Sequence, residues 1–304
     1  MPQITAPDNL CCPLDGRLLE SESGRFVCPD GHAFDLARQG YLNLLLVQHK
    51  RSRAPGDSKA MVQARTRFLD SGRYAGIAEA LADEALARLG ERSHATILDA
   101  GCGDGYYTQH LAATLAERWR GESFSMTGLD ISRPAIQAAA RRSRDIRWVV
   151  GTNRCLPAAA GSVDLLLSLF GYPQYAGFHA VLRPGGVLIL ADAGPRHLIE
   201  LRELLYDEVR IRPAPGVDAA IAAGFELAHT QKVAFRMERL QGDEILDLAT
   251  MTPHFFRASR QKREALERVQ SLNCSVDVVF RSLVKPVRPA SGAGRKAAGS
   301  PEFL

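Results

Sequence analysis

The stretch "LDAGCGDGYY", residues 98–107, decides the fold of this chain. It ends an apolar run that is typical of a buried strand, and the residues after it, "YYTQHLAATLAERW", have the spacing of a helix. Gly101, Gly103 and Gly105 permit a sharp turn between the two, where a ligand can approach bare backbone. No Gly-Lys-Ser/Thr follows, so the stretch is not a phosphate P-loop, although the glycines alone also fit a dinucleotide-binding turn.

Two acidic residues narrow this choice. Asp99 ends the first strand, where a carboxylate suits a cationic amino-acid group better than a pyrophosphate. Asp130 ends the next predicted strand, "SFSMTGLDIS" (123–132), and is placed to accept hydrogen bonds from ribose hydroxyls. Together they indicate a site for the methionine and nucleoside ends of S-adenosylmethionine. The alternative is a glycine-rich turn of a doubly wound sheet that does not bind this cofactor.

The residues after position 96 alternate between strand and helix patterns. Further strands are predicted at "IRWVVGTN" (146–153), "SVDLLLSLF" (162–170) and "GGVLILADAG" (185–194), with "RPAIQAAARRS" (133–143) as a helix. Such alternation predicts an α/β fold with a doubly wound, mostly parallel sheet. The order LDxGxGxG, then LD, then "LRPGG" resembles the class I methyltransferases, whose sheet is Rossmann-like. This pattern indicates cofactor and reaction type rather than substrate.

The remaining C-terminal patterns complete this sheet. "PRHLIELRELLYDEV" (195–209) is predicted as an amphipathic helix. "FELAHTQKVAFRM" (225–237) and "CSVDVVFRSL" (274–283) are predicted as closing strands around another helix. From about Val284 the chain mixes Pro, Gly, Ala and basic residues without an apolar period, which predicts a disordered tail.

The N-terminal part has a different character. Residues 9–47 are rich in turn formers and predict a small two-hairpin, zinc-ribbon-like β module. Cys12, Cys28 and His32 are spaced as three metal ligands, and Asp15 stands where a second cysteine is expected after Cys12. A basic loop at 49–58 follows, and then two helices. Asp57 or Ser58 caps the first of these, and the second runs from about Tyr74 to Leu89.

Composition limits the class of protein and the partners that can be expected. The chain has 304 residues with 38 Lys and Arg against 34 Asp and Glu, and this mild positive charge permits a nucleic-acid partner without demanding one. No apolar run approaches the roughly 20 residues that span a bilayer, and no secretory signal is visible, so a cytoplasmic protein without a membrane segment is expected. The predicted organisation is a module at 1–47, a basic linker with helices at 48–92, a methyltransferase domain at 93–284 and a tail at 285–304.

Three further stretches resemble a known family, the bacterial 23S ribosomal RNA (guanine-N1-)methyltransferases. They are "CPLDGRLL…CPDGHAFDLARQGYLNLL", "VQHKRSRAPGDSKAMVQARTRFLDSGRY", and "GPRHLIELRELLYDEV" with "MTPHFFRA". The resemblance spans roughly residues 9–283. The "HKRSRAPGD" and "GPRHL" pieces are far more specific than the glycine loop. The long "VQHKRSR" form looks more like the housekeeping branch of the family than the tylosin-resistance branch. The segment "LFGYPQYAG" (169–177) departs from the family pattern, which has Ala-Pro near Gly171 and Tyr172.

The resemblance implies ligands and partners. Members methylate a guanine in a domain II hairpin of 23S rRNA, and a homodimer is the implied assembly. The implied zinc ligands are Cys12, Asp15, Cys28 and His32, with Asp15 in place of a cysteine. Zinc accepts carboxylate oxygen, but structural sites favour thiolates, so hairpins held by packing alone are the alternative. With Tyr74, Tyr107, Thr108 and His197 added by resemblance, the cofactor-binding candidates are Tyr74, Asp99, Gly101, Gly103, Gly105, Tyr107, Thr108, Asp130, Asn153 and His197.

The chemistry of guanine methylation suggests further residues. Guanine N1 must lose a proton, and His197 and Asp192 are candidate bases because both follow the "LIL" run (188–190), at the carboxyl edge of the sheet where ligands bind. His197 as a contact of the cofactor alone is the alternative. A loop guanine must be unstacked, and Tyr172 and Tyr175 are candidates to stack on it unless they are simply packed. The residues His49, Lys50, Arg51 and Arg53 form a candidate phosphate clamp, or a solvated basic loop.

Three hypotheses for function follow. The first is an S-adenosylmethionine-dependent rRNA guanine-N1 methyltransferase. The second is a small-molecule methyltransferase on the same scaffold. The third is an RNA-binding protein that holds the cofactor without turnover.

Overall fold

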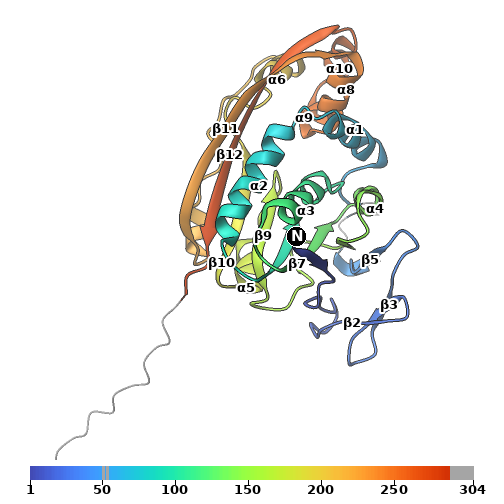
Figure 1. The fold of residues 1–304 in the computed structure, drawn as a ribbon. Coiled ribbons are helices and arrows are strands. Elements are labelled where there is room, and N and C mark those ends of the chain that lie inside the picture. The colour runs from blue at the N-terminus through green and yellow to red at the C-terminus, as the bar shows by residue number, and fades with distance from the viewer. Residues whose placement is uncertain (50–51, 53–54, 288–304) are drawn as a thin grey trace, which may run out of the picture.

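A nine-stranded sheet forms the centre of the computed structural model, which describes residues 1–49, 52 and 55–287 (Figure 1). The strand order is β11-β12-β10-β9-β6-β7-β8-β5, and β1 pairs with the first residues of β7. The strands are β1 Gln3–Thr5, β5 Tyr41–Asn43, β6 His94–Ala100, β7 Ser123–Asp130, β8 Arg147–Val150, β9 Val163–Leu169, β10 Leu182–Ala193, β11 Glu226–Gln241 and β12 Ser271–Val284.

The central strands of this sheet are parallel. β6 pairs in parallel with both β7 and β9, and β10 continues the parallel set on β9. Only the C-terminal pair breaks the pattern, because β12 runs antiparallel to both β10 and β11. The predicted class I methyltransferase sheet is confirmed. Because Asp99 and Asp130 end neighbouring parallel strands, they lie at the same edge of the sheet.

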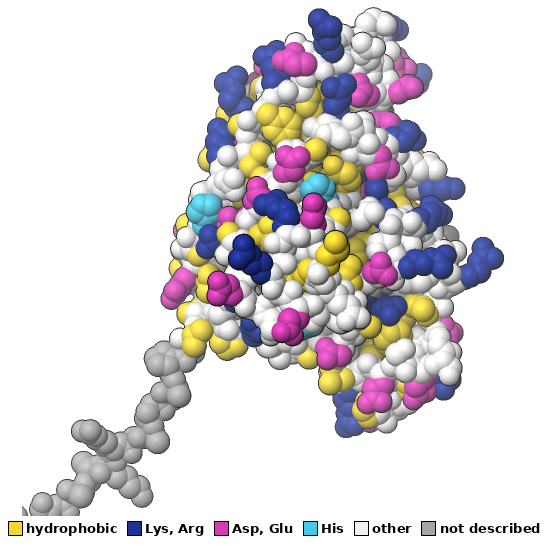
Figure 2. Space-filling view, viewed as in Figure 1, with side chains coloured by type: hydrophobic (Ala, Val, Ile, Leu, Met, Phe, Trp, Pro, Cys, Tyr) yellow, Lys and Arg dark blue, Asp and Glu magenta, His cyan; other side chains and the backbone are white. Residues whose placement is uncertain are grey.

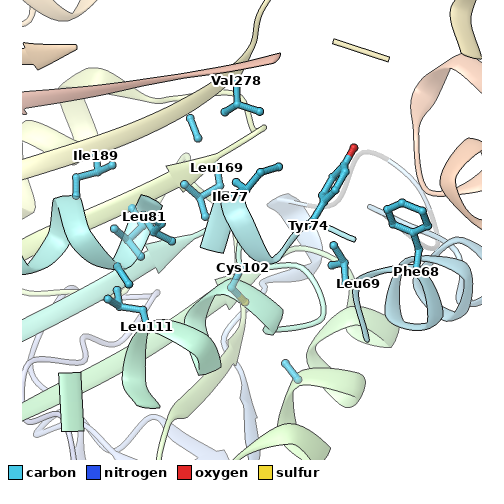
Figure 3. Close-up of a cluster of buried hydrophobic side chains, with 14 of the residues drawn as sticks. Phe68, Leu69, Tyr74, Ile77, Leu81, Cys102, Leu111, Leu169, Ile189 and Val278 are labelled. Atoms are coloured by element: carbon cyan, nitrogen blue, oxygen red, sulfur yellow. The ribbon is translucent and has the colours of Figure 1, made fainter. Parts of the chain in front are cut away.

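Helices cover one face of the sheet around a large apolar core. The helices on this face are α1 Lys59–Asp70, α2 Ala75–Leu89, α3 Tyr106–Arg118, α4 Arg133–Arg142 and α6 Ile199–Leu205. Figure 3 shows part of this core, where Leu81 and Leu111 from the helices face Ile189 of the sheet. Tyr74 and Phe68 extend the same cluster, with their ring centroids 5.3 Å apart in an edge-to-face arrangement.

The other face is covered by short elements and by the N-terminal module. The helices here are α5 Tyr175–Val181 and α7 Asp218–Ala222. Three helices connect β11 to β12 and lie near one end of that long ribbon: α8 Gly242–Thr250, α9 Pro253–Arg257 and α10 Arg260–Leu266 (Figure 1). A single helix was expected between these strands, but Thr252 and Ser259 each start a new helix after the one before it has ended.

The N-terminal module is a three-stranded sheet in which two hairpins share the middle strand. Its strands are β2 Glu20–Glu22, β3 Arg25–Val27 and β4 Ala33–Asp35, in the order β2-β3-β4. The expectation of two hairpins is confirmed. The module packs on the large sheet, because Phe26 and Leu19 share a buried cluster with Leu98 and Val149. A short 3-10 helix, Val47–His49, follows β5.

One helix is shorter than the sequence predicts, and the structure decides between two predicted cap residues. The helix predicted at 195–209 is only α6, because Leu198 has a left-handed backbone (φ 53°) before it and Tyr206 is extended after it. The loop 194–197 is instead tied to β12, as described below. At the start of α1, Ser58 rather than Asp57 is the cap, and its hydroxyl accepts from the amide of Met61 at 3.3 Å.

The surface mixes both signs of charge. Figure 2 shows basic and acidic side chains interspersed over one face, as the nearly balanced composition suggests. Within the described residues, no helix is long and apolar enough to span a membrane.

Candidate active site and metal centre

The glycine loop after β6 turns sharply into α3. Gly101, Gly103 and Gly105 all have positive φ angles, of 102°, 58° and 80°. At Gly105 the space also demands glycine, because a Cβ atom there would lie 2.6 Å from the ring of Trp148. The loop therefore presents backbone rather than side chains at the carboxyl edge of β6.

Asp104, inside this loop, anchors it to two helices. The hydroxyl of Thr66 on α1 donates to its carboxylate at 2.8 Å, and Arg142 on α4 donates to it at 2.5 Å. Arg142 also donates to the backbone carbonyl of Asp104 at 2.9 Å. Sequence reasoning missed this anchor because its partners lie 38 residues away on either side.

Asp99 is a buried carboxylate with one unused oxygen. The residue is 1% exposed, and one of its oxygens accepts from the hydroxyl of Thr108 at 2.6 Å. The other, Oδ1, is buried without a hydrogen-bond partner among the described residues. Burial raises the pKa of Asp99 to about 7. The negative charge of Asp130 adds to this rise, whereas the hydrogen bond from Thr108 lowers the pKa. A buried oxygen of this kind fits a cationic donor such as the cofactor ammonium.

Asp130 is held by backbone amides. Gly103 donates to one of its oxygens at 3.0 Å, and Ser132 donates to the other at 2.7 Å. Burial raises the pKa of Asp130, and these two amides oppose the rise. Because a carboxylate oxygen can accept more than one bond, both oxygens keep capacity for ribose hydroxyls.

Aromatic side chains gather beside the loop. The hydroxyl of Tyr74 lies 3.5 Å from Nε2 of His197. Phe170 stacks on His197 with ring centroids 6.1 Å apart, and Tyr107 lies 6.3 Å from Phe170. The cofactor candidates Tyr74, Tyr107 and His197 are thus brought together from three separate segments. Asn153 also reaches the loop, because its amide lies 3.4 Å from the carbonyl of Ala100.

Both nitrogens of His197 are engaged. The backbone amide of Asp277 donates to Nδ1 at 3.3 Å, so the proton of the neutral ring lies on Nε2, which faces Tyr74. Burial lowers the pKa of His197 to about 4, although Asp277 opposes this. In this geometry the ring is neutral and has no free lone pair for a proton from guanine.

Asp192 lies on the opposite face of the sheet from His197. Its neighbours Leu188 and Leu190 point into the core under the N-terminal module, whereas His197 contacts Tyr74 of the helix-covered core. Arg281 on β12 pairs with Asp192 at 3.0 Å. The two candidate bases are therefore not brought together.

Phe170 is a site residue that sequence reasoning did not select. It follows β9 directly, has a left-handed backbone (φ 54°) and is 42% exposed. Bulky residues rarely adopt this conformation outside functional or strained sites. Of the two tyrosines considered for stacking, Tyr175 packs against Phe225 with ring centroids 6.5 Å apart, and Tyr172 is 85% exposed.

The four candidate metal ligands converge in the N-terminal module. The donor atoms of Cys12, Asp15, Cys28 and His32 all lie within 4.8 Å of one another. Nδ1 of His32 is 3.6 Å from the sulfur of Cys12 and 3.4 Å from that of Cys28. It is 2.9 Å from a carboxylate oxygen of Asp15, which also accepts from the thiol of Cys28 at 3.0 Å.

These distances suit a tetrahedral ion. Ligands about 2.0–2.3 Å from zinc at tetrahedral angles lie about 3.3–3.8 Å apart. The two sulfur–nitrogen distances fall in this range, and the two distances to Asp15 need to open by a few tenths of an ångström. Cys11 is not part of the cluster, since its sulfur lies 3.8 Å from the carbonyl of Asn9. The residues present therefore fit a zinc ion, with Asp15 as the oxygen ligand.

The predicted phosphate clamp is only partly in view. Lys50, Arg51 and Arg53 lie outside the described residues. His49 ends the 3-10 helix before them.

Two family models match the chain. The N-terminal zinc ribbon of RlmA matches residues 10–53, and a methyltransferase domain matches residues 97–186. A protein of Bacillus subtilis named as a 23S rRNA (guanine-N1-)-methyltransferase, YxjB, is 31% identical over 88% of this chain and 94% of its own length. The 23S rRNA (guanine(748)-N1)-methyltransferase of Streptomyces fradiae is 36% identical over 80% of this chain and 84% of its own length.

This chain belongs to the 23S rRNA (guanine-N1-)-methyltransferase family. It is an enzyme with an S-adenosylmethionine-dependent methyltransferase domain, and the family predicted from the sequence is confirmed. A relative of another kind, the malonyl-[acyl-carrier protein] O-methyltransferase of Xylella fastidiosa, is 35% identical over 47% of this chain and 52% of its own length. The family members are matched over most of this chain, and the O-methyltransferase over about half of it.

Proposed function

We propose that this enzyme transfers a methyl group from S-adenosylmethionine to N1 of one guanine in a domain II hairpin of 23S rRNA. The observation that carries the proposal is the length of the match to the family. Relatives named for guanine-N1 methylation match 80–92% of the chain. A common cofactor domain would explain a match to about half of it, as for the O-methyltransferase.

The residues of the site support this chemistry. S-adenosylmethionine supplies an activated methyl group, and the chain must orient the acceptor nitrogen toward it. Phe170 holds an exposed ring next to His197 and Tyr107, where a flipped guanine would stack. His197, with its proton on Nε2, acts as part of the cofactor wall rather than as the base.

Substitution of His197 tests this assignment. For His197→Ala, we expect weaker cofactor binding because the aromatic wall loses a member. We also expect a single-turnover rate within about threefold of the wild type at saturating cofactor, since a general base contributes about 10²–10⁴-fold. Rapid-quench measurements on RNA would decide, and a loss of 100-fold or more at saturation would restore His197 as the base.

The other parts of the chain take supporting roles in this proposal. Zinc, held by Cys12, Asp15, Cys28 and His32, fixes the two turns of the N-terminal module. This module at 1–47, with Lys50, Arg51 and Arg53 in the linker, contacts RNA beside the methyltransferase domain at 93–284. The enzyme acts in the cytoplasm, where ribosomal RNA is made, and a homodimer is the expected assembly.

Two alternative functions predict different modification of rRNA or different turnover. A small-molecule methyltransferase would use the same cofactor but leave rRNA unmodified. A non-catalytic RNA-binding protein would bind both ligands without turnover. Mass mapping of 23S rRNA from cells with and without the gene separates them. We expect one N1-methylguanine to be missing in the deletion strain and to return with the wild-type gene. An unchanged map would contradict the proposal.

A further inference from the structure

Arg65 on α1 lies against the glycine loop. A Cβ atom built on Gly103 would lie 3.4 Å from Nη1 of Arg65 and 4.0 Å from its Cδ, and no other heavy atom of the described chain outside the neighbouring residues comes within 4 Å. The side chain is 25% exposed, so it is partly sheltered yet open to a ligand. None of the cofactor-binding candidates drawn from the sequence lies on α1, so this helix adds a group that the site so far lacks.

The guanidinium is positioned by two neighbouring segments. Nη1 pairs with the carboxylate of Asp57 at 2.5 Å, and Nη2 donates to the carbonyl of Met251 at 3.2 Å. Asp57 is itself held near the end of β7, because its carbonyl accepts from the hydroxyl of Ser132 at 2.7 Å. Within the described residues these contacts use two of the five N–H donors that a guanidinium offers. The remaining donors are available to a ligand on the loop.

Arg65 also acts on the charges around the loop. Burial raises the pKa of Asp130, and Arg65 opposes that rise while Asp57 adds to it. The same guanidinium opposes the larger rise that burial gives to the pKa of Tyr107. Its positive charge is therefore felt both at the ribose-side carboxylate and at the aromatic wall. The other arginine at the loop, Arg142, is taken up by Asp104 and Asp70.

The cofactor has three kinds of polar group that this site must match. Its ammonium suits the buried oxygen of Asp99, and its ribose hydroxyls suit Asp130. The remaining group is the carboxylate of its methionine end. Asp57, Asp99 and Asp130 around the loop would repel this anion unless a cation faced it.

We propose that Arg65 binds the carboxylate of the methionine end of S-adenosylmethionine, as a cofactor-binding residue supplied by α1. Guanidinium is the side chain best matched to a carboxylate in geometry and charge. The ion pair with Asp57 and the bond to Met251 hold Arg65 ready beside Gly103 before the cofactor arrives. This role does not depend on which substrate receives the methyl group.

Calorimetry with two ligands tests the proposal. S-adenosylhomocysteine keeps the carboxylate, whereas 5′-methylthioadenosine keeps the nucleoside and sulfur but lacks the amino-acid end. For Arg65→Gln, we expect S-adenosylhomocysteine to bind about 10- to 100-fold more weakly, the range for a lost hydrogen bond to a charged group. We expect the affinity for 5′-methylthioadenosine to change by less than about threefold.

Arg67→Gln is the matched control. Arg67 lies on the same helix and binds Asp247 of α8 through two bonds of 2.5 and 2.8 Å, so it makes a comparable tie to the 242–257 region. It should leave both affinities unchanged. Equal losses for both ligands in Arg65→Gln, or no loss for either, would overturn the proposal.

A second variant covers the case in which Arg65→Gln does not fold by circular dichroism. Arg65→Lys keeps the charge but loses the planar fork. We expect it to weaken S-adenosylhomocysteine by about three- to tenfold while leaving 5′-methylthioadenosine unchanged. A folded Arg65→Lys that weakens both ligands alike, or neither, would also overturn the proposal.

Discussion

Asp15 and Asp99 are both candidate ligand-binding carboxylates, but they lie in opposite surroundings. Asp15 lies in an exposed turn of a module whose three strands have three residues each. The thiol of Cys28 and the amide of Arg17 donate to it, and they lower its pKa. Asp99 is buried at the end of a seven-residue strand, with a pKa raised to about 7.

The difference shows what holds each region together. The glycine loop is fixed from outside by protein groups, since Asp104 is tied to α1 and α4 and Gly105 packs on Trp148. The turns at Cys12 and Cys28 have their donor groups pointing at one another, which is an arrangement that a cation would complete. The glycine loop is therefore held by protein contacts alone, whereas the proposed zinc ion would complete the contacts of the N-terminal turns.

The largest expected effect is on metal binding. For Cys28→Ser, we expect zinc affinity to fall at least about 100-fold, because a thiolate ligand is lost outright. Asp15→Cys should bind zinc more tightly than the wild type, and Asp15→Ala more weakly. Competition with a chromophoric chelator measures all three.

The same variants test whether the glycine loop is independent of the metal site. Because the glycine loop is held by protein groups, Cys28→Ser should retain affinity for S-adenosylhomocysteine within about threefold. Equal zinc affinity in Asp15→Ala and the wild type would remove Asp15 from the ligand set. In that case the module would be held by packing around Phe26 and Leu19.

Asp99→Asn gives the next largest effect. The folded chain keeps the Asp99 proton up to a pH of about 7, whereas an unfolded chain releases it near 3.8. Without cofactor, this group therefore makes stability fall as the pH rises from about 4 to 7, by an amount on the order of 4 kcal/mol. We expect Asp99→Asn to lose that part of the slope and to be the more stable protein at pH 8.

Cofactor binding should change in the opposite direction. Asn cannot pair with an ammonium, so Asp99→Asn should bind S-adenosylhomocysteine about 10- to 100-fold more weakly. Chemical denaturation from pH 5 to 8 and calorimetry measure the two effects on one protein. A variant that is both less stable at pH 8 and unchanged in affinity would show that Asp99 is only structural.

The smallest effect is a proton released on binding. A bound ammonium beside Asp99 favours its charged form, so S-adenosylhomocysteine should bind more tightly as the pH rises from about 5 to 7. Near pH 6.5, up to about one proton should be released, seen as a difference in binding heat between buffers of different ionisation enthalpy. Asp99→Asn serves as the control and should show no such difference.

The sequence alone predicts those parts of the site whose ligand-binding residues lie within a short, recognisable pattern. Strands ending at Asp99 and Asp130 were predicted from apolar runs, and parallel pairing brings both acids to one edge. The metal cluster was predicted because Cys12, Cys28 and His32 occur in short turns with a fixed spacing. In each case the pattern that predicts the site lies within a short segment of the sequence.

The residues that sequence reasoning missed depend on contacts between distant segments. Arg65 reaches Gly103 only after α1 has packed on the sheet, and no local pattern distinguishes it from Arg67. Phe170 owes its place to a left-handed backbone, which an apolar run does not predict. Asp192 lies near the end of β10 and His197 in the loop that follows it, yet the two side chains lie on opposite faces of the sheet.

Methyl transfer to RNA tests the central claim most directly. The purified enzyme would be incubated with S-adenosylmethionine carrying a labelled methyl group and a domain II hairpin of 23S rRNA. A second RNA would have the target guanine replaced by adenine. We predict label in the first RNA only, recovered as N1-methylguanosine after digestion. Label in neither RNA, from protein that binds S-adenosylhomocysteine, would contradict guanine-N1 methylation of this hairpin.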